Sequence, residues 1–206
     1  MNKGASNGNL TFRDYKHLIL SDLYRISGAF TLTSLFREVL LGGSSYQYIF
    51  WMRTCRYASE NRLLRRALYP VARVLLRRYR YKYGIAIPFT TSIGSGFYIG
   101  HFGCIIVHQK TVIGRNCNLS QGVTLGQANR GKNKGYPTIG DNTYVGPGAK
   151  VIGAVSIGDN VAVGANSVVT KDVPNNAVVA GVPAKIISYK GSVDYIGNTD
   201  YEGKIP

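Results

Sequence analysis

The sequence predicts a left-handed parallel β-helix preceded by an α-helical region. An isoleucine, leucine or valine recurs at every sixth position between Ile93 and Val169, and glycine or another small residue usually follows it. A helix would show a period of about 3.6 residues and a single flat strand a period of about 2. A period of six is typical of a hexapeptide solenoid, in which the aliphatic side chains point into a coil with three flat faces and small residues turn the corners.

The repeat is interrupted twice. A two-residue slip precedes Ile113, and an eight-residue insertion precedes Ile139. Since each coil has three faces, the repeats make about four coils. The aliphatic residues that begin repeats are Ile93, Ile99, Ile105, Ile113, Leu119, Leu125, Ile139, Val145, Val151, Ile157, Val163 and Val169.

Helical spacing dominates the residues before the repeats. Positions 1–9 are polar and glycine-rich, and we expect them to be loosely attached. Apolar residues at helical spacing over 11–41 predict a first helix, which Thr11 or Asp14 would cap. The glycines and serines at 42–45 would end that pattern.

Two further helices and a closing element complete the expected elements. A second helix is expected over 46–59, and a third from about Asn61, kinked or interrupted at Pro70. After the last coil, residues 178–188 are expected to form a closing strand or short helix. The polar tail from Gly191 is expected to be mobile.

These elements divide the chain into three parts: a basic helical region over 1–84, a β-helix over 85–188 and a C-terminal tail over 189–206. The apolar fraction of 45% and the charged fraction of 17% fit an ordinary folded protein. Three cysteines do not make a disulfide framework, and neither a secretory signal nor a long apolar span is visible. The cytoplasm is therefore the expected compartment.

The net charge of +15 is concentrated in one segment. Arg53–Lys82 holds ten basic residues and one acidic residue, mixed with apolar ones. No nucleic-acid-binding motif accompanies it, so we expect no nucleic-acid partner. Two interpretations remain open: a helical cap whose arginines extend along apolar surface, or a basic amphipathic helix that contacts the inner face of an anionic membrane.

The insertion before Ile139 reads GQANRGKNKGYP and is expected to project as a loop. Loops on rigid repeat scaffolds often carry binding residues. Its Arg130, Lys132 and Lys134 would suit an anionic ligand, although an inert solvated loop would have the same composition.

Two histidines lie within the repeats. His101 replaces a small residue where the chain should turn a corner, so its ring should lie outside the apolar interior. Because imidazole changes charge near neutral pH, it is a natural general base for a hydroxyl group. His108 lies seven residues further on and is the weaker candidate.

Residues 85–188 contain three connected motifs: IGHFGCIIVHQKTVIGRNCNLSQGVTLG, the loop, and a stretch that ends in GVPAKII. With these motifs, the segment closely resembles the serine acetyltransferase branch of the hexapeptide acyltransferases. The resemblance implies acetyl-CoA as co-substrate, no metal, a three-fold homotrimer and His101 as general base. The basic helical region followed by this solenoid also looks like acetyltransferases of bacterial capsule and exopolysaccharide synthesis.

The resemblance also implies a coenzyme site between neighbouring solenoids. The matching positions are Gly126, Gln127, Pro147, Ala149 and Ala165, and Lys171 and Lys185 could bind the phosphates. The backbone N–H of Gly126 or of its neighbour would hold the tetrahedral oxyanion. Cys104 and Cys117 could suggest a thiol nucleophile, but both fall at repeat positions that favour small buried residues.

Three positions depart from the serine acetyltransferase pattern. The aspartate before the catalytic histidine is Gly100, the arginine–histidine pair after the loop is Gly135 and Tyr136, and the carboxylate that orients the imidazole is Ala86. Asn118, Gln121 or a backbone carbonyl would have to orient His101 instead.

Because lost polar contacts weaken recognition of an amino acid, these departures predict a sugar or surface-polysaccharide acceptor, whether free, lipid-linked or polymeric. His108, Arg130 and Tyr136 would lie near it. The alternatives are serine acetylation in cysteine synthesis, a non-catalytic scaffold or membrane-surface module, and a zinc solenoid. The last would need three histidine ligands.

Overall fold

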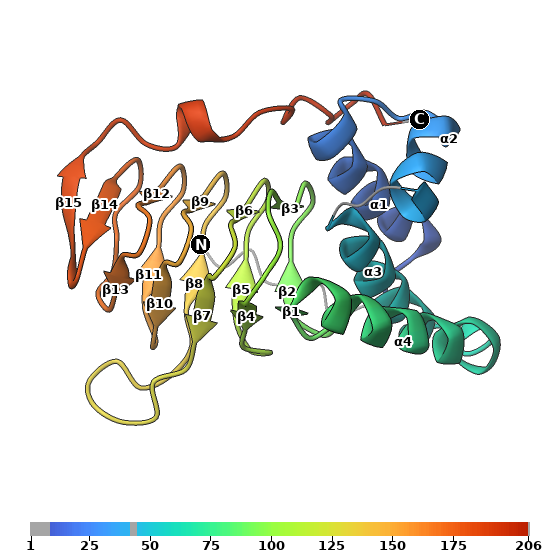
Figure 1. The fold of residues 1–206 in the computed structure, drawn as a ribbon, viewed down its shortest axis with the longest axis horizontal. Coiled ribbons are helices and arrows are strands. Elements are labelled where there is room, and N and C mark those ends of the chain that lie inside the picture. The colour runs from blue at the N-terminus through green and yellow to red at the C-terminus, as the bar shows by residue number, and fades with distance from the viewer. Residues whose placement is uncertain (1–8, 42–44, 206) are drawn as a thin grey trace.

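The computed structural model describes residues 9–41 and 45–205. A long β-helix carries a group of helices at one end (Figure 1), as the repeats and the helical spacings predict. Most of the expected loose segment at 1–9 and of the break at 42–45 lies outside the described residues. Within those residues, no helix is both long and apolar enough to cross a membrane.

The first predicted helix is in fact two elements. α1 (Phe12–Ser27) begins with a capping box in which Thr11 and Asp14 bond each other's backbone N–H, so both expected capping residues take part. It ends at Gly28, whose φ of 66° is left-handed. α2 (Leu32–Phe36) then runs into a π-helical turn, η1 (Arg37–Leu41).

The other two helices follow the prediction more closely. α3 (Tyr46–Glu60) fills the expected range, and α4 (Leu64–Tyr83) starts three residues after Asn61. Pro70 lies inside α4, which continues through it and ends at the left-handed Gly84. Strand structure begins with the next residue, Ile85.

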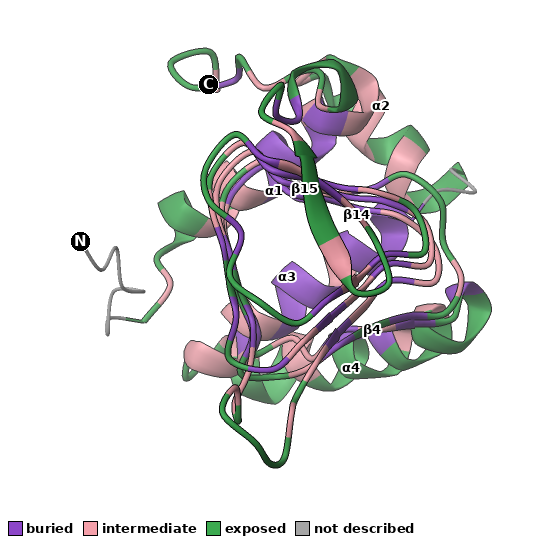
Figure 2. Cartoon of the chain, turned by 90° about the vertical axis from the view of Figure 1, so that its left-hand side faces the viewer, coloured by how far each residue is buried: buried purple, intermediate pink, exposed green. Residues whose placement is uncertain are grey.

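Short parallel strands build the three walls of the β-helix, which Figure 2 shows nearly end-on. Sheet A contains β1 (Ile85–Ala86), β4 (Ile105–Val107), β7 (Thr124–Gly126), β10 (Lys150–Ile152) and β13 (Val168–Val169). Sheet B contains β2 (Ser92–Ile93), β5 (Val112–Ile113), β8 (Thr138–Ile139) and β11 (Ser156–Ile157). Sheet C contains β3 (Tyr98–Ile99), β6 (Asn118–Leu119), β9 (Tyr144–Val145), β12 (Ala162–Val163) and β14 (Val178–Gly181). The antiparallel β15 (Ala184–Ser188) closes sheet C.

The strand register moves the two-residue slip to a different place. Ile99 pairs with Leu119, and Val107 pairs with Leu125. Val107 therefore follows Ile99 by eight residues, whereas the matching Leu125 follows Leu119 by six in the next coil. The extra two residues lie after Ile99, not before Ile113. Val107 rather than Ile105 begins the repeat, while Ile105 is a second inward-pointing residue.

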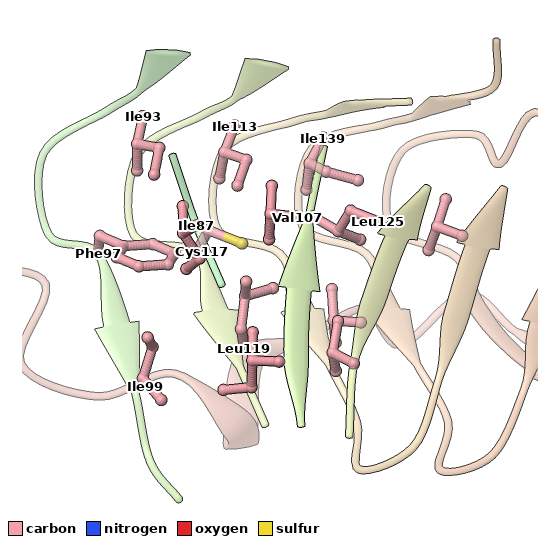
Figure 3. Packing of buried hydrophobic residues seen from close by; sticks show 14 of the residues in the cluster. Ile87, Ile93, Phe97, Ile99, Val107, Ile113, Cys117, Leu119, Leu125 and Ile139 are labelled. Carbon is pink, nitrogen blue, oxygen red and sulfur yellow. The ribbon is translucent and has the colours of Figure 1, made fainter. Parts of the chain in front are cut away.

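The interior of the coils is a continuous column of aliphatic side chains (Figure 3). Ile99, Leu119 and Val145 lie one above another on sheet C, and each is at most 1% exposed. Burial of one such side chain contributes about 1.5–3 kcal/mol. The six-residue period is thus the spacing of this column.

Asparagines turn the corner between sheets B and C. Asn116, Asn142, Asn160 and Asn176 all have φ between 53° and 61°, a left-handed conformation that asparagine tolerates better than most residues. Their side-chain amides bond one another from coil to coil at 2.9, 3.0 and 3.1 Å.

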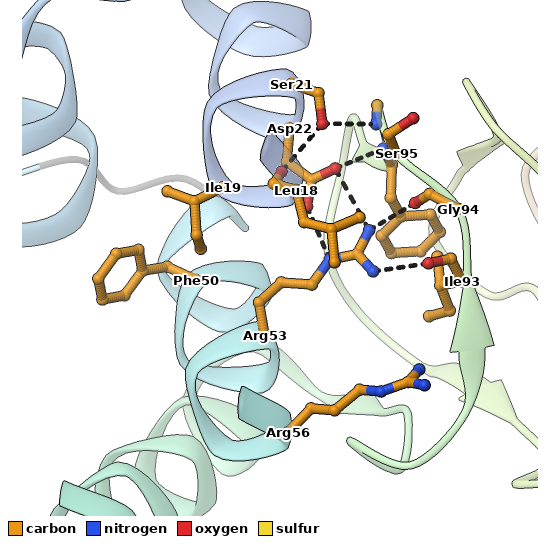
Figure 4. Close-up of polar contacts among 12 residues, drawn as sticks. Leu18, Ile19, Ser21, Asp22, Phe50, Arg53, Arg56, Ile93, Gly94 and Ser95 are labelled. Atoms are coloured by element: carbon orange, nitrogen blue, oxygen red, sulfur yellow. Dashed lines mark hydrogen bonds and ion pairs between the residues drawn. The ribbon is translucent and has the colours of Figure 1, made fainter. Parts of the chain in front are cut away.

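A buried ion pair attaches the helices to the first coil (Figure 4). Arg53 of α3 donates from Nε to Oδ2 of Asp22 at 2.9 Å, and both side chains are at most 3% exposed. Arg53 also donates to the carbonyls of Ile93 and Gly94 at 2.7 and 2.6 Å, while Asp22 accepts the N–H of Phe97 at 2.7 Å. Burial raises the pKa of Asp22 above its usual value, and the Arg53 guanidinium offsets only part of this rise.

The C-terminal tail is ordered, contrary to the expectation of a mobile tail. After η2 (Val193–Tyr195) it runs back beside sheet C towards α1 (Figure 1). Tyr195 stacks on Tyr144 with ring centroids 4.6 Å apart. Tyr201 is 1% exposed and its hydroxyl donates to Oδ1 of Asn116 at 2.6 Å. These contacts hold a segment whose composition resembles that of a loop.

The first prediction concerns the ion pair. Asp22→Ala should lower the free energy of unfolding by about 3–5 kcal/mol, because it leaves the Arg53 guanidinium buried without its carboxylate. Urea denaturation followed by circular dichroism measures this. Lys204→Ala breaks the exposed pair between Asp200 and Lys204 and is the control, expected to leave the midpoint almost unchanged. Equal effects of the two substitutions would contradict this role for Asp22.

Candidate active site

The displaced slip places His101 in a bulge of the corner between sheets C and A. The N–H of Gly122 donates to the carbonyl of Gly103 at 2.7 Å, whereas one coil later Gly148 donates to Gln121 at 2.8 Å. Gly103 is therefore the counterpart of Gln121. Three residues, 100–102, separate it from β3, where a single residue, Ser120, does so in the next coil. The extra residues push His101 out of the column.

The bulge is anchored beside an exposed imidazole. Phe102 packs against the ring of Tyr83, with centroids 4.6 Å apart. His101 itself is exposed, and no hydrogen bond joins it to another described residue. A base that must accept a proton from a substrate hydroxyl needs a reachable, uncommitted nitrogen, and this corner provides one.

Of the two side chains expected to orient His101, only Gln121 is available. Asn118 accepts a bond from Arg25 and donates to the carbonyl of Tyr195 at 2.9 Å, so its amide is committed to the helices and the tail. Gln121 lies at the same corner in the next coil. Its Oε1 is buried, with no hydrogen-bond partner among the described residues.

His108 belongs to a second cluster. His101 precedes β4 and His108 follows it, so one chain does not bring the two histidines together. The ring of His108 stacks on the ring of Tyr136 with centroids 4.4 Å apart, and Nζ of Lys110 lies over the Tyr136 ring, 5.2 Å from its centroid. The N–H of Lys110 donates to Nδ1 of His108 at 3.1 Å, so the neutral ring carries its proton on Nε2. Sequence reasoning missed Lys110, for which no motif exists.

The insertion projects from the β-helix (Figure 1), but it is also tied back to it. Ala128 and Gly135 exchange backbone bonds of 3.0 Å across the loop. Asn133 donates from Nδ2 to the carbonyl of Thr170 at 2.6 Å, and its own carbonyl accepts from Ala154 at 2.9 Å. The exposed Arg130 therefore lies on a loop with fixed ends.

The expected coenzyme residues occupy several positions. Pro147 and Ala165 follow Gln121 along the same corner, because Asn166 donates to Pro147 at 2.8 Å as Gly148 does to Gln121. Gly126 ends β7 and Gln127 is exposed beside it. The corner between sheets C and A, from the bulge to Ala165, is thus one continuous row, whereas Gly126 and Gln127 lie at the next corner, between sheets A and B.

The remaining positions lie away from that row. Ala149 is fully buried, and its N–H and carbonyl are bonded to Gly146 and Thr124. It therefore has no surface for a coenzyme, because its side chain points into the column. Lys171 is exposed after β13, and Lys185 is exposed on β15.

Two of the three cysteines are buried thiols without nucleophilic character. Burial raises the pKa of Cys117 and of Cys55 to about 12, so both remain thiols at neutral pH. Cys104 was expected to be buried but is exposed, because it turns the corner with a φ of 52°. Among the described residues no group of three or more histidines, cysteines and carboxylates could hold a metal ion.

Comparisons with known proteins agree with the repeat. The family model for the bacterial transferase hexapeptide (six repeats) matches residues 136–171. A serine acetyltransferase of Synechococcus elongatus is 36% identical over 155 residues, which are 75% of this chain and 61% of that protein. A serine acetyltransferase of Helicobacter pylori is 39% identical over 132 residues, which are 64% of this chain and 77% of that protein.

The chain belongs to the serine acetyltransferase family. Solved structures agree: a serine acetyltransferase from Brucella abortus covers 87% of this chain and is itself covered to 71%, with a TM-score of 0.66 and 27% identity. The same enzyme solved in complex with coenzyme A gives 28% identity, covers 87% of this chain and 70% of that one, and has a TM-score of 0.66. The chain spans less than two thirds of the Synechococcus relative.

This family membership corrects the expected acceptor. The sequence departures at Gly100, Gly135 and Tyr136 favoured a sugar or surface polysaccharide, but the relatives and solved neighbours are serine acetyltransferases. More than one hundred aligned residues outweigh three altered positions, so the alternative of serine acetylation is the better supported one.

The second prediction concerns the loop in this serine acetyltransferase homologue. Asn133→Ala removes the side-chain bond to Thr170 and should speed amide hydrogen exchange across 128–135 several-fold, since local opening then costs less free energy. Asn129→Ala is the matched control, because Asn129 is exposed on the same loop. Unchanged exchange in Asn133→Ala would show that the backbone bonds alone hold the loop.

Proposed function

We propose that this chain transfers the acetyl group of acetyl-CoA to the hydroxyl of serine. The carrying observation is the 39% identity to the Helicobacter pylori serine acetyltransferase, of which the chain covers 77%. Support for the coenzyme comes from the Brucella abortus neighbour solved with coenzyme A. The row of corner residues beside His101 offers an exposed edge along which an extended coenzyme could lie.

In this proposal His101 acts as the general base. Its imidazole takes the proton of the serine hydroxyl while that oxygen attacks the thioester carbonyl. The backbone N–H of Gln127 holds the oxyanion, because the N–H of its neighbour Gly126 takes part in the parallel pairing of β7 with β10. When the intermediate collapses, the new C–O bond remains and the C–S bond breaks. The departing coenzyme thiolate then takes from the imidazolium the proton that came from the serine hydroxyl. Gln121, with its free buried oxygen, orients the ring.

The acceptor pocket has fewer polar groups than the family pattern. Gly100 and Gly135 carry no side chain, and Tyr136 is stacked with His108. Because the serine ammonium and carboxylate then lack partners, we expect a higher KM for serine, not a different reaction. His108 and Lys110 both contact the ring of Tyr136, and Arg130, Lys132 and Lys134 precede Gly135 along the chain.

We also infer a three-fold trimer and a peripheral membrane contact. The outward-facing Ile106 of sheet A is 53% exposed, as expected of a strand that another protomer covers. Arg53 is buried against Asp22, so a contact with an anionic membrane would fall on α4. That helix has seven basic residues and no acidic one. The cytoplasm stays the expected compartment.

The third prediction tests the reaction. With acetyl-CoA and serine, the protein should release free coenzyme thiol and form O-acetylserine, measured with a thiol reagent and by mass spectrometry. His101→Ala should lower kcat at least about 100-fold, because general-base catalysis contributes about 10²–10⁴-fold.

His101→Ala must have the same oligomer mass as wild type, measured by light scattering. We expect this because the His101 ring is exposed and folding does not depend on it. His17→Ala, a histidine of α1 away from the coils, is the matched control and should retain most of kcat. The proposal is wrong if thiol release does not depend on serine, or if His101→Ala keeps normal activity.

The fourth prediction concerns the coenzyme phosphates. Lys171→Gln and Lys185→Gln should each raise the KM for acetyl-CoA several-fold while kcat changes little, because a charge-assisted bond to a phosphate is lost. Lys190→Gln removes an equally exposed lysine beyond β15 and serves as the control. If all three variants behave alike, the two lysines contribute only overall charge.

A further inference from the structure

A groove between α4 and the first coil meets the candidate active site only at Ala86. It encloses a cavity of about 700 Å³. One side is formed by α4, with Arg73, Arg77 and Arg80 among its lining residues, and the other by residues 86–90 together with Gln109. None of the lining residues is acidic.

The three arginines share one face of the helix. Their spacing of four and then three residues brings them onto adjacent turns. Arg73 lies over the ring of Phe89 at 5.2 Å, and Arg77 lies over the ring of Tyr81 at 6.0 Å. Stacking on an aromatic ring leaves the edge N–H groups of a guanidinium free to donate.

No carboxylate in the described chain forms an ion pair with any of these three arginines, whereas Arg53, Arg56 and Arg115 each have one. Like charges along one helix face repel one another. Here three of them line a hollow beside the exposed apolar Val74 and Tyr81.

We propose that this groove binds a phosphate-bearing ligand. Guanidinium groups bind phosphate oxygens through paired N–H donors, and three in a row fit a phosphate diester or a pyrophosphate better than a single carboxylate. The apolar rim accommodates the organic part of the ligand. The phosphate can belong to a soluble ester or to a lipid headgroup. This site does not depend on the proposed acetyl transfer.

The test uses two triple variants of the full chain with the same change in charge. Arg73→Gln/Arg77→Gln/Arg80→Gln empties the groove of cations. Arg65→Gln/Arg66→Gln/Arg78→Gln removes three exposed arginines of α4 that do not line it. Calorimetry measures the binding of inorganic pyrophosphate. Co-sedimentation measures the binding of phosphatidylcholine vesicles with and without phosphatidylglycerol.

The groove variant should bind pyrophosphate, or vesicles containing phosphatidylglycerol, at least about tenfold more weakly than wild type, while the control variant loses much less. Loss with pyrophosphate identifies a soluble ester, and loss only with vesicles identifies a lipid headgroup. Equal losses in the two variants, or no binding of either probe by wild type, would overturn the proposal.

Two further measurements keep the test decisive. If thermal unfolding shows that the triple variant is destabilised, Arg77→Gln alone replaces it, because Arg77 is exposed and its ring contact is with Tyr81 of the same helix. Pyrophosphate binding is also measured in Lys171→Gln/Lys185→Gln. Unchanged binding there separates the groove from the proposed coenzyme site, whereas its loss would place the probe in that site and contradict the groove.

Discussion

The open edge of the first coil is the constraint on which the rest of the structure depends. A parallel β-helix ends in backbone N–H and C=O groups without a strand beside them, and burying such groups without partners is costly. Here side chains of the helices supply the partners. Arg53 bonds Ile93 and Gly94, Asp22 bonds Phe97, and the hydroxyl of Tyr48 both accepts from and donates to Ile87. The helical region is therefore a cap whose polar side chains continue the hydrogen bonding of the sheets.

This cap explains why the basic segment was ambiguous from sequence. Arginines that bond an edge of the β-helix and arginines that face solvent occur at similar helical spacings, so the sequence pattern does not distinguish them. Only the structure separates Arg53, which is committed to Asp22, from Arg73, Arg77 and Arg80, which line a groove without carboxylate partners. The buried pair with Asp22 links residues 31 positions apart, and no local pattern encodes such a pair.

The periodic part of the fold was predictable because its cause is local. An inward aliphatic at each face and a small residue at each corner recur whatever happens elsewhere, so the β-helix and its insertion were found correctly. The slip was assigned to the wrong place because Ile105 and Val107 both point inward, and only pairing between coils decides which one begins the repeat. Relocating it by one face puts the irregularity at His101. The commitment of Asn118 to Arg25 and Tyr195, and the order of the tail, depend on contacts between distant segments.

The returning tail changes how the solenoid should unfold. In a repeat protein each coil contacts only its neighbours, so the terminal coils can open without the others. Here the segment after β15 crosses successive coils, through Ser192 at Asn142, Tyr195 at Tyr144 and Tyr201 at Asn116, and reaches α1, where Tyr24 donates to Asp200 at 3.2 Å. The last coil is thereby connected to the cap of the first. Opening either end must release contacts along the whole length, which makes a linear array behave as a single cooperative unit.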